Sequence, residues 1–260
     1  AVRRLAGRSA RLRQGEFVVE GPQAVREAVT AHARSAIVHA LYGTGDALRR
    51  HPDIAAAATA AGMPAQVVDD AVLAAMSDTV HPQGLIAVCG LLDVPLQQVL
   101  DARPRLVAVL ARVRDPGNAG TVIRAADAAG ADAVILTGSS VDVHNPKCVR
   151  STAGSLFHLP IVAGVTLSEA VDGLRAAGLA VLAADGAGEL DLDDLQDDGA
   201  RGLLGGPVAW VFGNEAWGLP EEDRATADAV VRVPVHGRAE SLNLATAATV
   251  CLYATARAHR

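Results

Sequence analysis

Aromatic residues are scarce in this 260-residue chain, at only 3% of positions, although half of the residues are apolar. Alanine and valine supply most of that apolar half. Such a composition suits helices packed on a buried parallel sheet better than an aromatic-rich β-sandwich. The length allows one large domain or two smaller ones.

Cysteine is also scarce, and no long apolar run is present. The three cysteines, Cys89, Cys148 and Cys251, are far apart and lack CxxC spacing. This argues against a disulfide framework and against a zinc site, so we expect reduced thiols in a cytoplasmic protein without a bound metal. No stretch approaches the roughly 18 apolar residues of a membrane span, so we expect no membrane association.

Two nucleotide-binding fingerprints are missing as well. Neither GxGxxG nor GxxxxGK[ST] occurs, which leaves a nucleotide-dependent oxidoreductase with little support. The net charge of −6 gives no overall case for nucleic-acid binding. Locally, however, a basic arm (residues 1–14) precedes the first acid, Glu16, and is a candidate phosphate contact. A solvated helix face or a frayed terminus explains it equally well; its arginines are Arg3, Arg4, Arg8, Arg11 and Arg13.

The chain divides into two regions. Residues 16–92 have the pattern of a small α/β unit, and a proline-containing stretch follows it. We therefore expect an N-terminal domain over 1–94, a linker over 95–105 and a second domain over 106–260. In the first domain we expect strands at 16–21, 35–43, 64–70 and 84–92 and helices at 22–33, 46–61 and 69–76.

The second region alternates short apolar runs with helical patterns. Continuous apolar strands that alternate with helices predict a parallel sheet covered on both faces. Ligands bind such sheets at the carboxyl ends of the strands. The expected strands are 106–111, 132–138, 179–185, 207–213 and 229–235, and the expected helices are 119–130, 167–177 and 242–257.

Three segments at such strand ends combine glycines with polar residues. In NAGTVIR (118–124), Asn118 is a candidate helix N-cap and Arg124 a candidate phosphate or ribose contact. A surface arginine on an amphipathic helix is the simpler explanation when this segment is considered alone. In FGNEAWGLP (212–220), glycines allow backbone groups to contact a ligand, and Glu215 among apolar neighbours is either functional or an exposed turn acid.

The third segment, SLNLATA (241–247), begins another helical pattern. Ser241 is a candidate N-cap, for which a purely structural role is a strong alternative. Asn243 is harder to explain by structure alone, because asparagine is a poor residue inside a helix. Elsewhere Lys147 is the only lysine, and with Arg150 it is a candidate anion or RNA contact.

Four segments in this order resemble the SpoU/TrmH branch of the SPOUT RNA methyltransferases. They are NAGTVIRAADAAG, KCVRSTAGSLFHLP, VFGNEAWGLP and VPVHGRAESLNLATAATVCLY. In addition, EFVVEGPQAVREAV and SDTVHPQGLIAV are similar to the N-terminal substrate-binding domain of that family. The resemblance implies an α/β catalytic domain with a deep trefoil knot, a smaller α/β RNA-binding domain and a homodimer formed through the C-terminal domain.

The same resemblance implies S-adenosylmethionine (AdoMet) as cofactor and transfer of its methyl group to a ribose 2′-hydroxyl of RNA. Ribosomal RNA is expected rather than transfer RNA, because of the separate N-terminal domain. A base methyltransferase and a non-catalytic RNA-binding protein stay open as alternatives. The GNEAWG loop, which contains Trp217, departs from the family, which often has a small residue before the acid and a charged one after it. The implied cofactor residues are Gly213, Asn214, Gly218, Val233 and Leu242, and the implied catalytic or RNA-facing residues are Asn118, Arg124, Glu215, Ser241 and Asn243.

Overall fold

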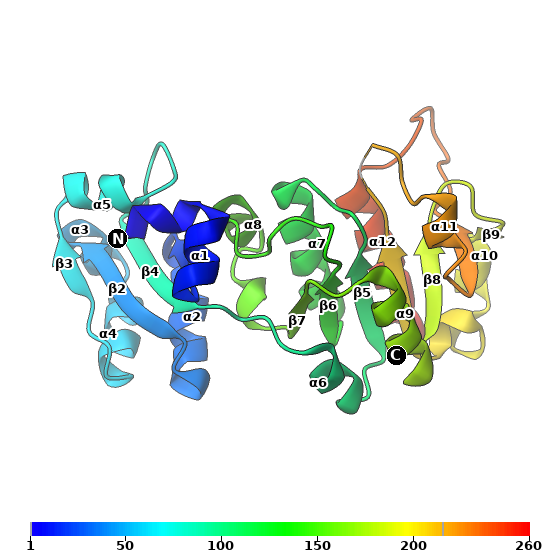
Figure 1. The fold of residues 1–260 in the computed structure, drawn as a ribbon, viewed down its shortest axis with the longest axis horizontal. Helices are drawn as coiled ribbons and strands as arrows, with labels where there is room; N and C mark the ends of the chain where they lie inside the picture. The colour runs from blue at the N-terminus through cyan, green and yellow to red at the C-terminus, as the bar shows by residue number, and fades with distance from the viewer. Residues whose placement is uncertain (1, 215) are drawn as a thin grey trace. The chain divides into compact units, whose positions relative to one another are not determined.

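The computed structural model describes residues 2–214 and 216–260. The chain forms two compact units, which are described separately below (Figure 1). The first unit contains residues up to Leu92 together with 142–158, and the second contains 93–141 with 159–260. The units therefore differ from two consecutive domains, because a segment from the middle of the chain belongs to the first unit.

The first unit is built on a four-stranded sheet in the order β1-β4-β2-β3. Strand β4 pairs antiparallel with both β1 and β2, whereas β3 runs parallel to β2. The elements are η1 (Val2–Ala6), α1 (Arg8–Gln14), β1 (Glu16–Glu20), α2 (Pro22–Ser35), β2 (Val38–Thr44), α3 (Gly45–Arg50), α4 (Pro52–Ala60), β3 (Gln66–Val68), α5 (Asp70–Met76), β4 (Leu85–Gly90), α8 (Pro146–Ser151) and η2 (Ser155–Phe157).

All four strands expected in this region are present. The single helix expected over 46–61 is instead two helices, α3 and α4, which are separated at His51. Pro52 is the reason: it has no N–H to continue α3, and its fixed φ suits the first position of a new helix.

The segment 142–158 packs into the first unit through aromatic and polar contacts. The ring of His144 lies 4.7 Å from that of Phe17, which is fully buried in β1, and Phe157 stacks at 6.4 Å on the same ring. The backbone N–H of Leu92 donates to Nε2 of His144 over 3.1 Å. These contacts complete the core beside β1 with residues that are distant in sequence.

The second unit is built on a seven-stranded sheet in the order β7-β6-β5-β10-β8-β11-β9, and every pairing in it is parallel. This confirms the predicted parallel α/β architecture. Its elements are α6 (Leu96–Asp101), β5 (Leu106–Leu110), α7 (Pro116–Ala129), β6 (Ala133–Leu136), β7 (Ile161–Ala163), α9 (Leu167–Ala176), β8 (Ala180–Ala184), β9 (Leu190–Asp191), α10 (Leu192–Asp197), η3 (Gly199–Arg201), η4 (Leu203–Gly205), β10 (Val208–Phe212), α11 (Glu221–Arg224), β11 (Ala229–Arg232) and α12 (Leu244–Ala258).

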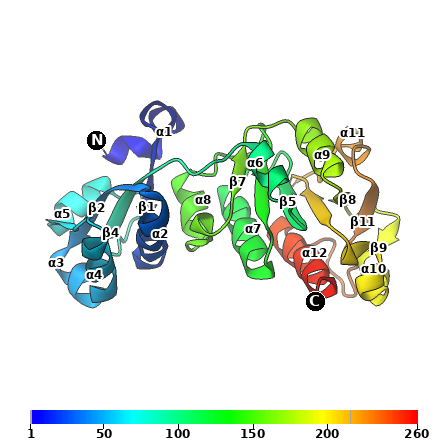
Figure 2. The ribbon, with the colours of Figure 1, turned by 90° about the horizontal axis from the view of Figure 1, so that it is seen from below.

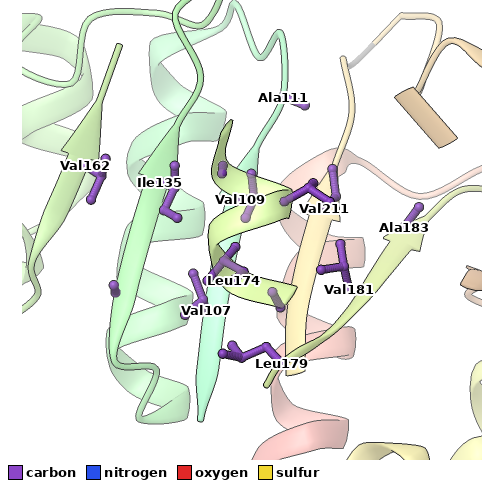
Figure 3. Close-up of a cluster of buried hydrophobic side chains, with 14 of the residues drawn as sticks. Val107, Val109, Ala111, Ile135, Val162, Leu174, Leu179, Val181, Ala183 and Val211 are labelled. Atoms are coloured by element: carbon purple, nitrogen blue, oxygen red, sulfur yellow. The ribbon is translucent and has the colours of Figure 1, made fainter. Parts of the chain in front are cut away.

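Helices cover both faces of this sheet. Helices α7 and α12 pack together on one face, and α6 and α9 lie on the other (Figure 2). On the α9 side, Val109 of β5, Val211 of β10 and Leu174 of α9 belong to one buried cluster (Figure 3). On the α12 side, the buried indole N–H of Trp210 donates to the hydroxyl of Thr255 over 2.9 Å. The sheet is therefore packed on both faces, and it positions the loops that follow its strands.

Residues 95–105, expected as a linker, contain helix α6. Val99 is buried in the core cluster of the second unit, and Leu96 and Leu100 pack against it. The two prolines that indicated a linker flank this helix: Pro95 precedes its first residue, and Pro104 follows its end.

Candidate active site

A pocket of about 600 Å³ opens at the carboxyl ends of β8, β10 and β11. Its size is within the range of small-molecule and cofactor sites. Each of the three strands contributes the residues that directly follow it, as expected for a parallel sheet. The lining includes Asp185, Gly186, Gly213, Asn214, Ala216, Gly218, Val233, Val235, Glu240, Ser241, Leu242 and Leu244.

The loop after β10 closes on itself at one wall of this pocket. The N–H of Asn214 donates to the carbonyl of Gly218 over 2.9 Å, and the N–H of Gly218 donates back over 3.0 Å. A Cβ on Gly213 would lie 2.4 Å from the carbonyl carbon of Gly218, so only glycine fits there. Gly218 has φ +66°, a conformation that favours glycine. Both glycines are therefore required by the shape of the loop itself.

Asn214 fastens this loop to the end of β5. It is buried, its Nδ2 donates to the carbonyl of Arg112 over 2.9 Å, and its Oδ1 accepts from the N–H of Ala216. Arg112 has φ +59° and pairs with Asp223 of α11 through Nε at 2.7 Å. An arginine in the left-handed region is uncommon, and the contacts on both sides of Arg112 hold it there.

Asp185, at the end of β8, is a pocket residue that sequence reasoning missed. Its Oδ2 accepts from the N–H of Leu219 at 3.2 Å, and its Oδ1 accepts from the N–H of Ala187 at 2.9 Å. Arg224 of α11 pairs with it at 3.3 Å. The available signal was an acid placed directly after an apolar strand, as in LAVLAAD.

Asn118 and Asn243 meet although 125 positions separate them in the sequence. The Nδ2 of Asn243 donates to Oδ1 of Asn118 over 3.1 Å. Both line a second pocket, of about 280 Å³, together with Thr121 and Thr246. This contact joins the start of α7 to the start of α12 and brings together two of the residues selected from the sequence.

Two predicted helix caps are wrong. Helix α12 begins at Leu244, and its N-cap is Asn243, whose Oδ1 accepts from the N–H of Ala245. Ser241 lies before the helix and lines the larger pocket instead. Helix α7 begins at Pro116 with Asp115 as its N-cap; the N–H of Asn118 donates to Asp115 Oδ1 over 2.8 Å.

Because α7 starts three residues earlier than predicted, Arg124 lies more than two turns from its start. Its side chain is exposed, and the described part of the chain gives its guanidinium no hydrogen bond or ion pair. Arg124 therefore has no partner within 2–214 and 216–260 that would keep it from an external ligand. Glu215, the acid predicted beside it, lies outside the described residues.

The basic arm divides into one structural arginine and four exposed ones. Arg11 is only 2% exposed: Nη2 pairs with Asp142 Oδ2 at 2.7 Å, and Nη1 donates to the carbonyls of Leu5 and Ala6. The prediction that Arg11 contacts RNA is wrong, because its donors are used inside the first unit. The exposed arginines are Arg3, Arg4, Arg8 and Arg13.

Lys147 and Arg150 both lie on α8, in the first unit. Lys147 is exposed. Arg150 is half-buried, and its Nη1 lies 3.7 Å from Glu20 and 3.6 Å from Asp78. Two nearby carboxylates offset the charge of Arg150, which weakens it as a candidate phosphate contact.

Two family profiles match the chain. The SpoU rRNA methylase family matches residues 105–253, and the RNA 2′-O ribose methyltransferase substrate-binding family matches residues 18–94. The chain belongs to the SpoU rRNA methylase family. A similar SpoU protein is the 23S rRNA (guanosine(2553)-2′-O)-methyltransferase RlmP of Bacillus subtilis (strain 168), 32% identical over 96% of this chain and 92% of that protein.

Solved SpoU structures agree with the fold. The methyltransferase AviRb of Streptomyces viridochromogenes in complex with AdoMet has a TM-score of 0.82 and 32% identity over 98% of this chain and 95% of that one. An AdoMet-bound rRNA methyltransferase from Sinorhizobium meliloti has a TM-score of 0.81 and 33% identity over 98% and 92%. The 23S rRNA (uridine(2479)-2′-O)-methyltransferase of S. viridochromogenes is 40% identical over 56% of this chain and 50% of that protein.

Within 2–214 and 216–260, no group of three or more His, Cys, Asp or Glu side chains is placed to hold a metal ion. No helix in the same ranges is long and apolar enough to cross a lipid bilayer.

Proposed function

We propose that this protein transfers a methyl group from AdoMet to a ribose 2′-hydroxyl of ribosomal RNA. The proposal rests on one observation in this SpoU-family chain: the residues selected from the sequence as cofactor contacts all line one pocket. Gly213, Asn214, Gly218, Val233 and Leu242 all line the pocket of about 600 Å³. Asn118 and Asn243 are hydrogen-bonded to each other in the same unit.

The chemical groups that line the pocket suit the parts of AdoMet. Val233, Val235 and Leu242 offer apolar surface to a flat base, and the glycine loop exposes backbone groups. Asp185 and Glu240 provide carboxylates that suit sugar hydroxyls and a positively charged group. We propose that Gly213, Asn214, Gly218, Val233 and Leu242 hold the cofactor. When bound, AdoMet supplies a methyl group already activated by the sulfonium.

The residues of the chain must then orient the ribose and stabilise charge on its 2′-oxygen. Fixing the reacting atoms in line lowers the barrier by proximity. A protein guanidinium stays protonated and cannot act as a base, so Arg124 stabilises the developing alkoxide, and a phosphate oxygen of the RNA accepts the proton of the 2′-hydroxyl. We assign orientation of the ribose to Asn118 and Asn243, since each side chain fixes the other. Ser241 and Glu215 complete the proposed set.

The RNA is contacted by the exposed arginines Arg3, Arg4, Arg8 and Arg13, with Lys147 as a further phosphate contact. Ribosomal rather than transfer RNA is proposed because the RlmP relative acts on 23S rRNA and matches across both regions of the chain. We further propose a homodimer through the C-terminal domain, the trefoil knot of the family and a cytoplasmic location, where ribosomal RNA is found.

Arg124→Ala tests the proposal. We expect methylation of in vitro transcribed 23S rRNA to fall by about 100- to 1000-fold, the usual loss when one donor to a developing oxyanion is removed. Calorimetry should show unchanged AdoMet binding. Arg201→Ala, an exposed arginine of the same unit, is the matched control and should keep full activity. Near-normal turnover of Arg124→Ala would rule out its role.

The product distinguishes the alternatives. A 2′-O-methylated nucleotide leaves an alkali-resistant dinucleotide in digested RNA, whereas a base methyltransferase leaves none. Methylation of transfer RNA but not of ribosomal RNA would reassign the substrate. A chain that binds RNA but shows no heat of AdoMet binding would be a non-catalytic RNA-binding protein.

A further inference from the structure

Trp217 is an exposed aromatic side chain in a chain that has few aromatic residues. It is 56% exposed, whereas Trp210, the other tryptophan, is fully buried. Its neighbours Ala216 and Gly218 line the cofactor pocket, but Trp217 does not. The indole therefore stands at the rim of the pocket and not inside it.

Arg114 lies against this indole. Its Cζ is 5.6 Å from the centroid of the Trp217 ring, within the range of a cation–π contact. Arg114 comes from the loop between β5 and α7, and Trp217 comes from the loop after β10. The pair thus joins two strand ends at the site, next to the helix that carries Arg124.

We propose that Trp217 and Arg114 form a stacking platform for a nucleobase of the substrate RNA. This inference rests on the proposed function, since it names how the RNA is held beside the methyl-transfer site. Bases splayed out of RNA stack on aromatic rings and on guanidinium planes. The platform contacts only the faces of a base, so it binds without selecting its identity.

The chemistry of the pair favours RNA over another protein surface. An exposed indole alone would suit either, but the guanidinium of Arg114 beside it adds a second flat surface on which a nucleobase can stack. Arg114 thus adds a stacking plane and a positive charge at one position. A methyltransferase that acts on a ribose must hold the attached or adjoining base near the methyl donor, which is where this pair lies.

Tryptophan fluorescence provides a direct test, because only two tryptophans are present. Trp210 is buried with its N–H bonded to Thr255, so it serves as an internal reference. A ten-nucleotide oligoadenylate should quench the emission of the full-length protein, whereas inorganic polyphosphate should not. The quenching should disappear in Trp217→Ala. Equal quenching by polyphosphate would overturn the proposal, since charge without a base would then suffice.

Kinetic measurements distinguish two roles of Trp217: stacking on a nucleobase, and holding the loop after β10 in shape. We expect Trp217→Ala to raise KM for 23S rRNA by about 5- to 100-fold, the usual range for one stacked base, with little change in kcat. Trp217→Phe should recover most of the loss, because a phenyl ring still stacks. AdoMet affinity, measured by calorimetry, should be the same in all three proteins. Weakened AdoMet binding in both variants would assign Trp217 to the loop and refute the platform.

Three other outcomes have distinct meanings. If the unsubstituted protein fails to methylate rRNA but oligoadenylate still quenches Trp217, the proposed function fails and the platform stands. If it methylates rRNA and Trp217→Ala has an unchanged KM, the platform is refuted and the function stands. A loss of dimer in sedimentation of Trp217→Ala, with no quenching by oligoadenylate, would make this surface a subunit contact and also refute the platform.

Discussion

Asp142→Asn removes the charge that balances a buried arginine. In the folded protein the Arg11 guanidinium reaches Asp142 Oδ2 through Nε at 3.0 Å and Nη2 at 2.7 Å. Arg11 is 2% exposed and the side chain of Asp142 is 15% exposed. Asparagine keeps the size of the side chain and an oxygen for the N–H of His144. The amide nitrogen of asparagine cannot replace Oδ2 as an acceptor, so the substitution removes the charge together with the two hydrogen bonds from Arg11.

The expected cost follows from the burial of the pair. Breaking a buried ion pair from one side costs about 3–5 kcal/mol, because the remaining charge is left without a partner. We expect Asp142→Asn to lower the free energy of unfolding by ~3 kcal/mol, at the low end of this range. Asp142 is slightly exposed, and two carbonyls still accept from Arg11 Nη1 in the variant. The double variant Arg11→Met, Asp142→Asn leaves no buried charge and should recover at least half of the loss.

Urea unfolding followed by circular dichroism measures the change, and hydrogen exchange over β1 and β4 assigns it to the first unit. Arg11→Met, Asp142→Asn should also bind rRNA as the unsubstituted protein does, since Arg11 is structural. A loss below about 0.5 kcal/mol for Asp142→Asn, or a double variant less stable than either single variant, would refute the reasoning.

The same pair predicts a pH dependence. Burial acts to raise the pKa of Asp142, but hydrogen bonds from His144 and Arg11 and the charge of Arg11 outweigh it and hold the pKa well below its usual range. The stabilisation is therefore complete above the unfolded pKa of about 3.9 and is lost as the pH falls through the lower folded value. The stability difference between the unsubstituted protein and Asp142→Asn should shrink below pH ~4; a constant difference would contradict this.

Substitutions at two positions, Gly213 and Asn243, test the site. Gly213→Ala places a Cβ 2.4 Å from the carbonyl carbon of Gly218, so we expect at least about a tenfold loss of AdoMet affinity by calorimetry; Gly237→Ala, where a Cβ meets open space, is the control. Asn243→Asp keeps the cap of α12 but loses the donor to Asn118, so methylation should fall at unchanged stability. Asn243→Ala should also lose about 1 kcal/mol of stability, and equal stability of the two variants would contradict this.

Periodic apolar runs predicted most of the second unit. Every strand expected from an apolar run there is present, and the selected polar residues lie at strand ends because parallel strands finish at one edge. The start of α7 was missed because Asp115 and Asn118 are both good caps in sequence. Pro116, suited to the first helical position, favours Asp115. The burial of Arg11 could not be predicted from the sequence, because its partner, Asp142, is 131 positions away.

The membership of residues 142–158 in the first unit has a consequence for synthesis on the ribosome. The chain leaves the first unit after Leu92 and returns to it at Asp142. Phe17 can therefore pack against His144 and Phe157 only after the intervening residues have been synthesised. At ~5–20 residues per second this takes several seconds. The first unit begins to fold before the second unit. Its core is nevertheless complete only after strands β5 and β6 of the second unit have been synthesised. Translation speed between Leu92 and His158 sets how long the face of β1 stays uncovered.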